Sequence, residues 1–113
     1  MKQNYYVVIA ALTVALLGWG PAVGAEDSVD VQIKLKDQKF SPAEPHAPAG
    51  KPIVITLKNL DPSPAEFESN TLRVEKVVTG GGTIVMRIRP LEAGRYRFFD
   101  DFHPETQGYL VVR

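Results

Sequence analysis

Apolar and polar residues alternate strictly in the segment that follows residue 28. The apolar positions are Val29, Val31, Ile33 and Leu35. The residues between them are charged or polar, and a period of two is typical of a β-strand that buries one face. Residues 51–60 show the same alternation. Both segments are therefore predicted to be half-buried strands.

Shorter runs of β-branched and aromatic residues predict further strands. They cover residues 75–78, 83–88, 95–99 and 109–112, whereas residues 69–74 fit neither a helical nor a strand period. Three prolines and a glycine between residues 41 and 50 exclude a helix there and favour an extended segment. No segment has the period of an ordinary amphipathic helix. The pattern predicts an all-β domain, either a sandwich or a small barrel.

The first 25 residues have the composition of an export signal. Lys2 supplies a positive charge, residues 5–17 are predominantly apolar, and the small residues at 23–25 suit a signal peptidase. An uncleaved membrane anchor is the alternative, but the apolar run is shorter than the ~20 residues that span a bilayer. We expect a signal peptide over residues 1–25, a folded domain over residues 26–113 and an exported, periplasmic location without stable membrane insertion.

The composition of the expected domain limits its partners. The chain has 13 basic and 13 acidic residues, and loss of Lys2 with the signal leaves a formal charge of −1. A nearly neutral domain gives no electrostatic reason to bind nucleic acid. The chain has no cysteine, so neither a disulfide nor a thiolate metal ligand is available to it.

Carboxylates and a histidine gather between the last two expected strands. They are Asp100, Asp101, His103 and Glu105. Carboxylate oxygen and imidazole nitrogen are metal ligands, so a loop carrying these residues is a candidate metal site. Two adjacent aspartates cannot face the same side of a strand, so we expect one as a ligand and the other as an outward or supporting residue. A solvated turn capped by aspartate explains the same residues without a metal.

Further candidate ligands lie upstream. In an extended segment, alternation sends Phe67 to one side and both Glu66 and Glu68 to the other, where they either join the same site or remain solvated. His46 is expected to be exposed in its proline-rich segment. Met86 alternates with apolar neighbours and is expected in the core. A ligand role for His46 or Met86 is the alternative left open.

The end of the chain resembles the ligand loop of cupredoxins, in which an aromatic strand leads to a cysteine and then a histidine. In the sequence Tyr-Arg-Phe-Phe-Asp-Asp-Phe-His of residues 96–103, Asp100 stands in the place of the cysteine and His103 matches the histidine. Thr106 or Gln107 lies near the usual axial methionine, and Glu66 lies where the other histidine is usually presented. The resemblance runs from residue 40 to 112 and is closest to the EfeO-type cupredoxin-like domains of bacterial iron-uptake systems.

The resemblance implies a cupredoxin-like Greek-key β-sandwich that binds a transition-metal ion, copper or iron. The implied metal ligands are Glu66, Glu68, Asp100, Asp101 and His103. A type 1 blue-copper centre requires a thiolate and two histidines, so the sequence does not predict one. The oxygen-rich donor set suits iron, manganese or cupric copper instead.

The resemblance also implies a role as an accessory of iron uptake, in ferrous iron oxidation or in metal handover. The implied partners are a periplasmic iron-binding protein and an inner-membrane iron permease. The alternative is a non-catalytic β-sandwich interaction module that has lost the ancestral copper site.

Overall fold

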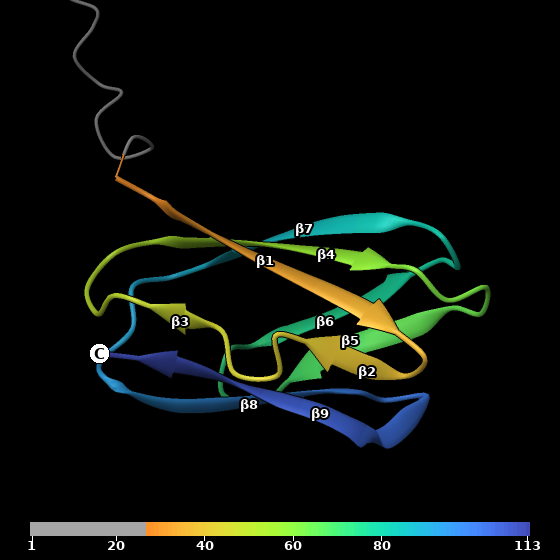
Figure 1. Cartoon of the computed structure of the whole chain (residues 1–113). Coiled ribbons are helices and arrows are strands. Elements are labelled where there is room, and N and C mark those ends of the chain that lie inside the picture. The colour runs from red at the N-terminus through yellow and green to blue at the C-terminus, as the bar shows by residue number, and fades with distance from the viewer. Residues whose placement is uncertain (1–26) are drawn as a thin grey trace, which may run out of the picture.

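The computed structural model describes residues 27–113, which form two β-sheets packed face to face (Figure 1). The expected signal peptide, residues 1–25, lies outside the described residues. Among residues 27–113, no helix is long and apolar enough to cross a membrane. The strands are β1 (Val29–Lys36), β2 (Lys39–Ser41), β3 (His46–Ala47), β4 (Ile53–Asn59), β5 (Ala65–Ser69), β6 (Val74–Val78), β7 (Thr83–Ile88), β8 (Gly94–Asp100) and β9 (His103–Val112).

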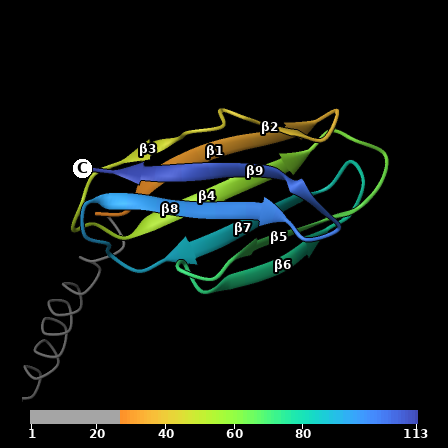
Figure 2. The same ribbon diagram turned by 90° about the horizontal axis from the view of Figure 1, so that it is seen from below.

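The chain crosses between the two sheets several times, so strands that follow one another in sequence often belong to different sheets. One sheet has the order β2-β1-β4-β7 and the other the order β3-β9-β8-β5-β6. The β1–β4 and β3–β9 pairs are parallel, and the other pairs are antiparallel. Figure 2 shows the two layers from below, with β8 and β9 together in one of them. The predicted all-β Greek-key sandwich is confirmed.

The core lies between the sheets and is built from the alternating residues of the first two expected strands. Val31, Ile33 and Leu35 of β1 are buried, as are the β4 residues at positions 53, 55 and 57. Met86 is buried too, as predicted. Complete burial of one such side chain contributes ~1.5–3 kcal/mol. In a chain without disulfides, this burial carries the stability of the described domain.

Three phenylalanine rings, those of Phe40, Phe67 and Phe98, pack together in the core. The ring of Phe98 lies 5.0 Å from those of Phe40 and Phe67, measured between centroids. Phe67 and Phe98 are fully buried, and they belong to the adjacent strands β5 and β8. The inward side of these strands is therefore fixed by packing, which leaves their alternate residues on the outer face.

The loop predicted between residues 99 and 109 is largely absent, and this part of the prediction is wrong. β8 extends to Asp100 and β9 begins at His103, so only Asp101 and Phe102 form the turn. Polar residues belong to these strands because one side of the hairpin faces solvent. β6 confirms the strand predicted over residues 75–78. It is an edge strand, and only Val78 in it is fully buried.

Three loops at the end of the sandwich that holds the β8–β9 turn are tied together. The buried Asn59 amide donates to the carbonyl oxygens of Ser63 (2.9 Å) and Thr79 (3.1 Å), and its oxygen accepts from Asp61 N. The Asp61 carboxylate accepts from the backbone N–H groups of residues 37 and 38 at the β1–β2 turn. These bonds hold the loop that leads into β5 in one position.

Candidate metal site

The outward positions of β5 supply two carboxylates. In Ala65–Ser69, the first, third and fifth residues are buried, whereas Glu66 and Glu68 are half-buried on the outer face of the five-stranded sheet. Sequence alternation predicted that Phe67 and the two glutamates lie on opposite sides of the strand, and the structure confirms it, with Phe67 buried in the core. The two glutamates are two positions apart on the same strand, so their side chains are neighbours.

Asp101 brings a third carboxylate to the same place. Its backbone N–H donates to the Glu66 carbonyl oxygen at 2.8 Å, which holds the β8–β9 turn against β5. In the described residues, Glu66, Glu68 and Asp101 form the one group of three or more potential ligands whose donor atoms all lie within 4.8 Å of one another. Two oxygens bound to the same ion are separated by at most about 5 Å, since metal–oxygen distances are ~2.0–2.6 Å. We call these three residues the acidic triad.

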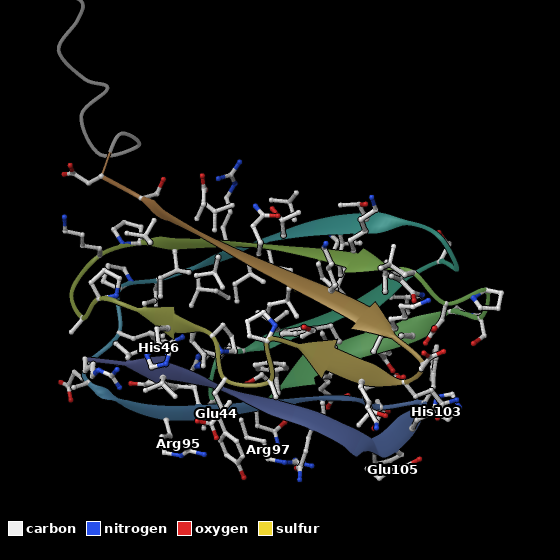
Figure 3. The ribbon with its side chains drawn as sticks, in the orientation of Figure 1. Glu44, His46, Arg95, Arg97, His103 and Glu105 are labelled. Carbon is white, nitrogen blue, oxygen red and sulfur yellow. The ribbon has the colours of Figure 1, made fainter. Side chains whose placement is uncertain are left out.

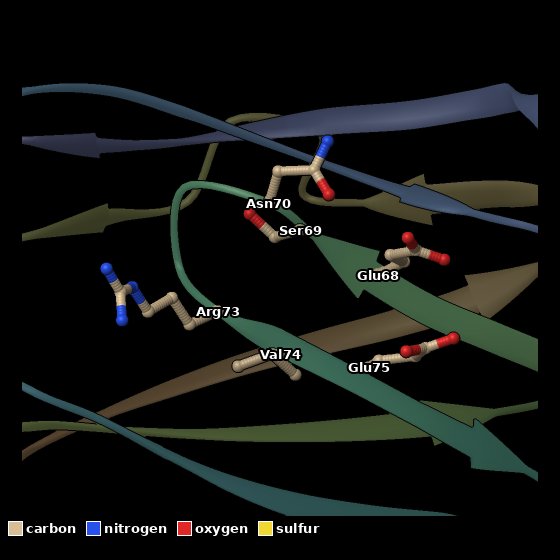
Figure 4. Close-up of a pocket in the computed structure, with 6 residues that line it drawn as sticks. All are labelled: Glu68, Ser69, Asn70, Arg73, Val74 and Glu75. Carbon is tan, nitrogen blue, oxygen red and sulfur yellow. The ribbon is translucent and has the colours of Figure 1, made fainter.

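Glu75 of β6 adds a fourth negative charge, which sequence reasoning missed. It lies directly opposite Glu68 in the β5–β6 ladder, and Figure 4 shows both side chains on the same face. Residues 69–74 show no clear pattern, so the sequence does not reveal how β5 and β6 are aligned or that Glu75 faces Glu68. In residues 27–113 the ion pairs are Arg95–Glu44 and His103–Asp100, so no cation neutralises these four carboxylates.

The surroundings of Glu66 and Glu68 raise the pKa of both side chains. Partial burial, followed by a hydrogen bond with Glu75 and repulsion from neighbouring carboxylates, raises the pKa of Glu66. Partial burial, followed by repulsion from Asp101 and Glu75, raises the pKa of Glu68. A cation bound among the acidic triad removes this repulsion, and it competes with protons for the same oxygens.

Asp100 faces the opposite way and is almost completely buried, with 2% of its surface exposed. One carboxylate oxygen accepts from Glu66 N (2.9 Å) and from Phe102 N (3.0 Å). The other oxygen lies 3.2 Å from His103 Nδ1. Asp100 therefore fixes the backbone that carries the triad and orients the His103 ring.

The five predicted ligands thus form two separate sets. Glu66, Glu68 and Asp101 gather outside, whereas Asp100 and His103 form a pair beside them. When Nδ1 of His103 carries the proton toward Asp100, Nε2 is left with a lone pair. The prediction that the two adjacent aspartates face different sides agrees with this arrangement.

The other candidate ligands lie apart from the triad. His46 is exposed on β3, and Figure 3 shows it at the opposite end of the sandwich from His103. Glu105 is exposed on β9 beyond His103. Met86 is buried in β7, which belongs to the other sheet.

The residues present do not fit a thiolate copper centre. Asp100 occupies the expected cysteine position, and its oxygens are already engaged by two backbone N–H groups and a histidine. Thr106, near the expected axial position, donates its hydroxyl proton to the Gln38 carbonyl oxygen. The acidic triad instead offers hard oxygen donors, which suit ions such as manganese or iron, or cupric copper.

Comparison with known proteins supports the fold and gives relatives. The cupredoxin-like domain family matches residues 8–112. An uncharacterized protein from Rickettsia prowazekii (strain Madrid E) is 36% identical over 94 residues, which are 82% of this chain and 75% of that protein.

Solved structures with the same fold include copper proteins. The metal-binding domain of the Cu(I)-exporting P-type ATPase CopA from Streptococcus pneumoniae D39, solved with Cu(I), has a TM-score of 0.70 and 21% identity, over 77% of this chain and 87% of that one. Auracyanin A, a blue copper protein from Chloroflexus aurantiacus, has a TM-score of 0.64 and 16% identity, over 76% and 99%. At these identities the likeness shows the fold alone.

We expect Asp100→Ala to lower the free energy of unfolding by about 1–3 kcal/mol, because the backbone N–H groups of Glu66 and Phe102 lose their shared acceptor. Asp100→Asn retains one acceptor oxygen and should cost less than half as much. Urea unfolding of both variants measures the difference. Equal losses for the two substitutions would show that these hydrogen bonds do not support the turn.

The raised pKa values of Glu66 and Glu68 predict how the metal-free protein responds to pH. Its folded state holds these protons more tightly than the unfolded chain, whose glutamates titrate near 4.5. Burial of the charged carboxylates, together with their repulsion, therefore lowers stability above the folded pKa, and this loss disappears below about pH 4.5. Glu68→Gln should raise the Tm near pH 7, and this gain should vanish near pH 4.

Thermal unfolding in the presence of a chelator tests this expectation. Glu92→Gln is the matched control, since Glu92 is an exposed carboxylate outside the cluster and its removal should leave the Tm near pH 7 unchanged. A lower Tm for Glu68→Gln than for the unmodified protein near pH 7 contradicts the predicted repulsion.

Proposed function

The chain belongs to the cupredoxin-like domain family, and on this premise we propose that it is a metal-binding accessory of iron uptake whose ion is held by the acidic triad. The observation that carries the proposal is the convergence of Glu66, Glu68 and Asp101 within 4.8 Å, without a neighbouring cation in the described residues. Glu68 also lies directly opposite Glu75 in the β5–β6 ladder, and like charges at directly opposed positions destabilise a sheet. A bound cation accounts for their presence here.

The chemistry of the donors favours iron or cupric copper over the cuprous ion. Three carboxylates supply three negative charges, and hard anionic oxygens stabilise a trivalent ion more than a divalent one. A ferrous ion that reaches the triad is therefore more readily oxidised there, with one electron passing to an acceptor such as dissolved dioxygen. The acidic triad acts in this step by neutralising the charge of the ferric product.

The biological setting of the proposal follows from the resemblance to EfeO-type domains. We propose an exported, periplasmic protein that receives iron or copper and passes it to a periplasmic iron-binding protein, which supplies an inner-membrane permease. The solvent-facing position of the triad supports this handover, because a partner can reach the ion without opening the core.

A non-catalytic interaction module is the second candidate. The observation in its favour is that Asp100, at the expected cysteine position, is fully engaged in hydrogen bonds within the turn. A domain that had lost its ancestral copper site would retain such a stabilised hairpin. The two candidates differ in whether the isolated protein binds any transition metal.

We expect calorimetric titration to show one bound ion per chain for copper(II), manganese(II) or anaerobic iron(II). Glu68→Gln should weaken binding by about tenfold or more, because it removes one of three charged ligands. His103→Gln should weaken it less, and Glu92→Gln should leave it unchanged. Absence of binding by all three ions would favour the interaction module.

Ferrous oxidation separates a redox role from simple transport. In air, we expect stopped-flow absorbance to show faster ferric formation with the protein than in buffer, both with and without added copper(II). The same acceleration should be lost in Glu68→Gln and retained in Glu92→Gln. Tight binding without acceleration would remove the oxidation step and leave the protein as a metal carrier.

A further inference from the structure

A surface pocket adjoins the acidic triad and shares one of its residues. It lies where β5 turns into β6 and has a volume of about 270 Å³. Its lining residues are Glu68, Ser69, Asn70, Arg73, Val74 and Glu75. Glu68 belongs both to this pocket and to the triad, so a molecule in the pocket lies beside any ion that the triad holds.

The pocket has opposite charges at its two ends. Figure 4 shows the carboxylates of Glu68 and Glu75 at one end and the Arg73 guanidinium at the other. The ion pairs of the described chain do not include Arg73, so its charge is not neutralised by a carboxylate of residues 27–113. An available guanidinium at the far end of the pocket favours an anionic group there.

The turn that carries Arg73 is anchored to the sandwich. Ser69 Oγ donates to the Arg97 carbonyl oxygen at 2.6 Å and accepts from Leu72 N at 3.1 Å. Leu72, the residue before Arg73, is buried in the core. The base of the arginine side chain is therefore fixed relative to β5, and Arg73 lines the pocket.

The charge pattern also indicates the class of ligand. Three carboxylates do not complete the coordination of manganese or iron, which commonly take about six ligands in oxygen-rich sites. Guanidinium binds a carboxylate through two parallel hydrogen bonds. A molecule with a carboxylate at each end can satisfy both requirements.

We propose that this pocket binds a small dicarboxylate, with one carboxylate on Arg73 and the other on the metal ion held by Glu66, Glu68 and Asp101. The inference rests on the proposed metal function, because without the ion the carboxylates of the pocket repel the near end of the ligand. The ion and the dicarboxylate then bind cooperatively, and the metal is received or released together with its organic ligand.

Equilibrium dialysis with radiolabelled succinate tests this cooperativity. Succinate is suitable because its two carboxylates are separated by two methylene groups. We expect about one succinate per chain when the protein is loaded with copper(II) or anaerobic iron(II), and at least about tenfold weaker retention without metal. Radiolabelled acetate, which has no second carboxylate, should be held equally by the unmodified protein and by an Arg73 variant.

Arg73→Gln is the decisive variant, with Arg87→Gln as its control on the exposed face of the other sheet. Arg73 has a positive φ of 60°, and since glutamine is also a non-glycine residue, the substitution adds no new backbone restriction. Arg73→Gln should weaken succinate retention by about tenfold or more while metal binding is preserved. Arg87→Gln should behave like the unmodified protein.

The outcomes separate this inference from the function on which it rests. If metal binds but succinate is not retained, or is retained equally by Arg73→Gln, the dicarboxylate site is wrong and the metal site stands. Equal retention with and without metal also overturns the bridging arrangement. If none of the ions binds, both the proposed function and this inference fail.

Discussion

The alternation of side chains along β5 and at the end of β8 is the constraint on which the candidate site depends. Phe67 and Phe98 must face the core, since together with Phe40 they form its aromatic cluster. Their neighbours must then face outward, and this places Glu66 and Glu68 side by side. The same alternation buries Asp100, whereas Asp101 is exposed in the turn that follows, so one carboxylate supports the hairpin while the other completes the triad.

The site carries an electrostatic cost that the fold tolerates. Four carboxylates share one face without a compensating cation in the described residues, and partial burial together with their mutual repulsion raises the pKa of Glu66 and Glu68. Sheets can accept such repulsion where packing beneath is strong, as it is above the buried phenylalanines. A cation that binds such carboxylates in the folded state removes their repulsion and so stabilises the fold.

Sequence alone predicted the features that follow from local periodicity. Alternation identified β1 and β4, the core position of Met86 and the common face of Glu66 and Glu68. It did not predict the length of the β8–β9 hairpin, because polar residues on a solvated strand face look like a loop. It also missed Glu75 and the Arg73 pocket, since both depend on the register between β5 and β6. Register is a tertiary property that a single sequence does not reveal.

The position of β9 within its sheet affects the order in which the domain can form. β9 is the last strand along the chain, yet it lies inside the five-stranded sheet, between β3 and β8. That sheet therefore cannot close while residues 103–112 remain in the ribosome, and its parallel β3–β9 contact joins segments more than sixty residues apart. Such non-local pairing slows folding. The five-stranded sheet is thus completed only after its last strand has left the ribosome, however early the first strands become available.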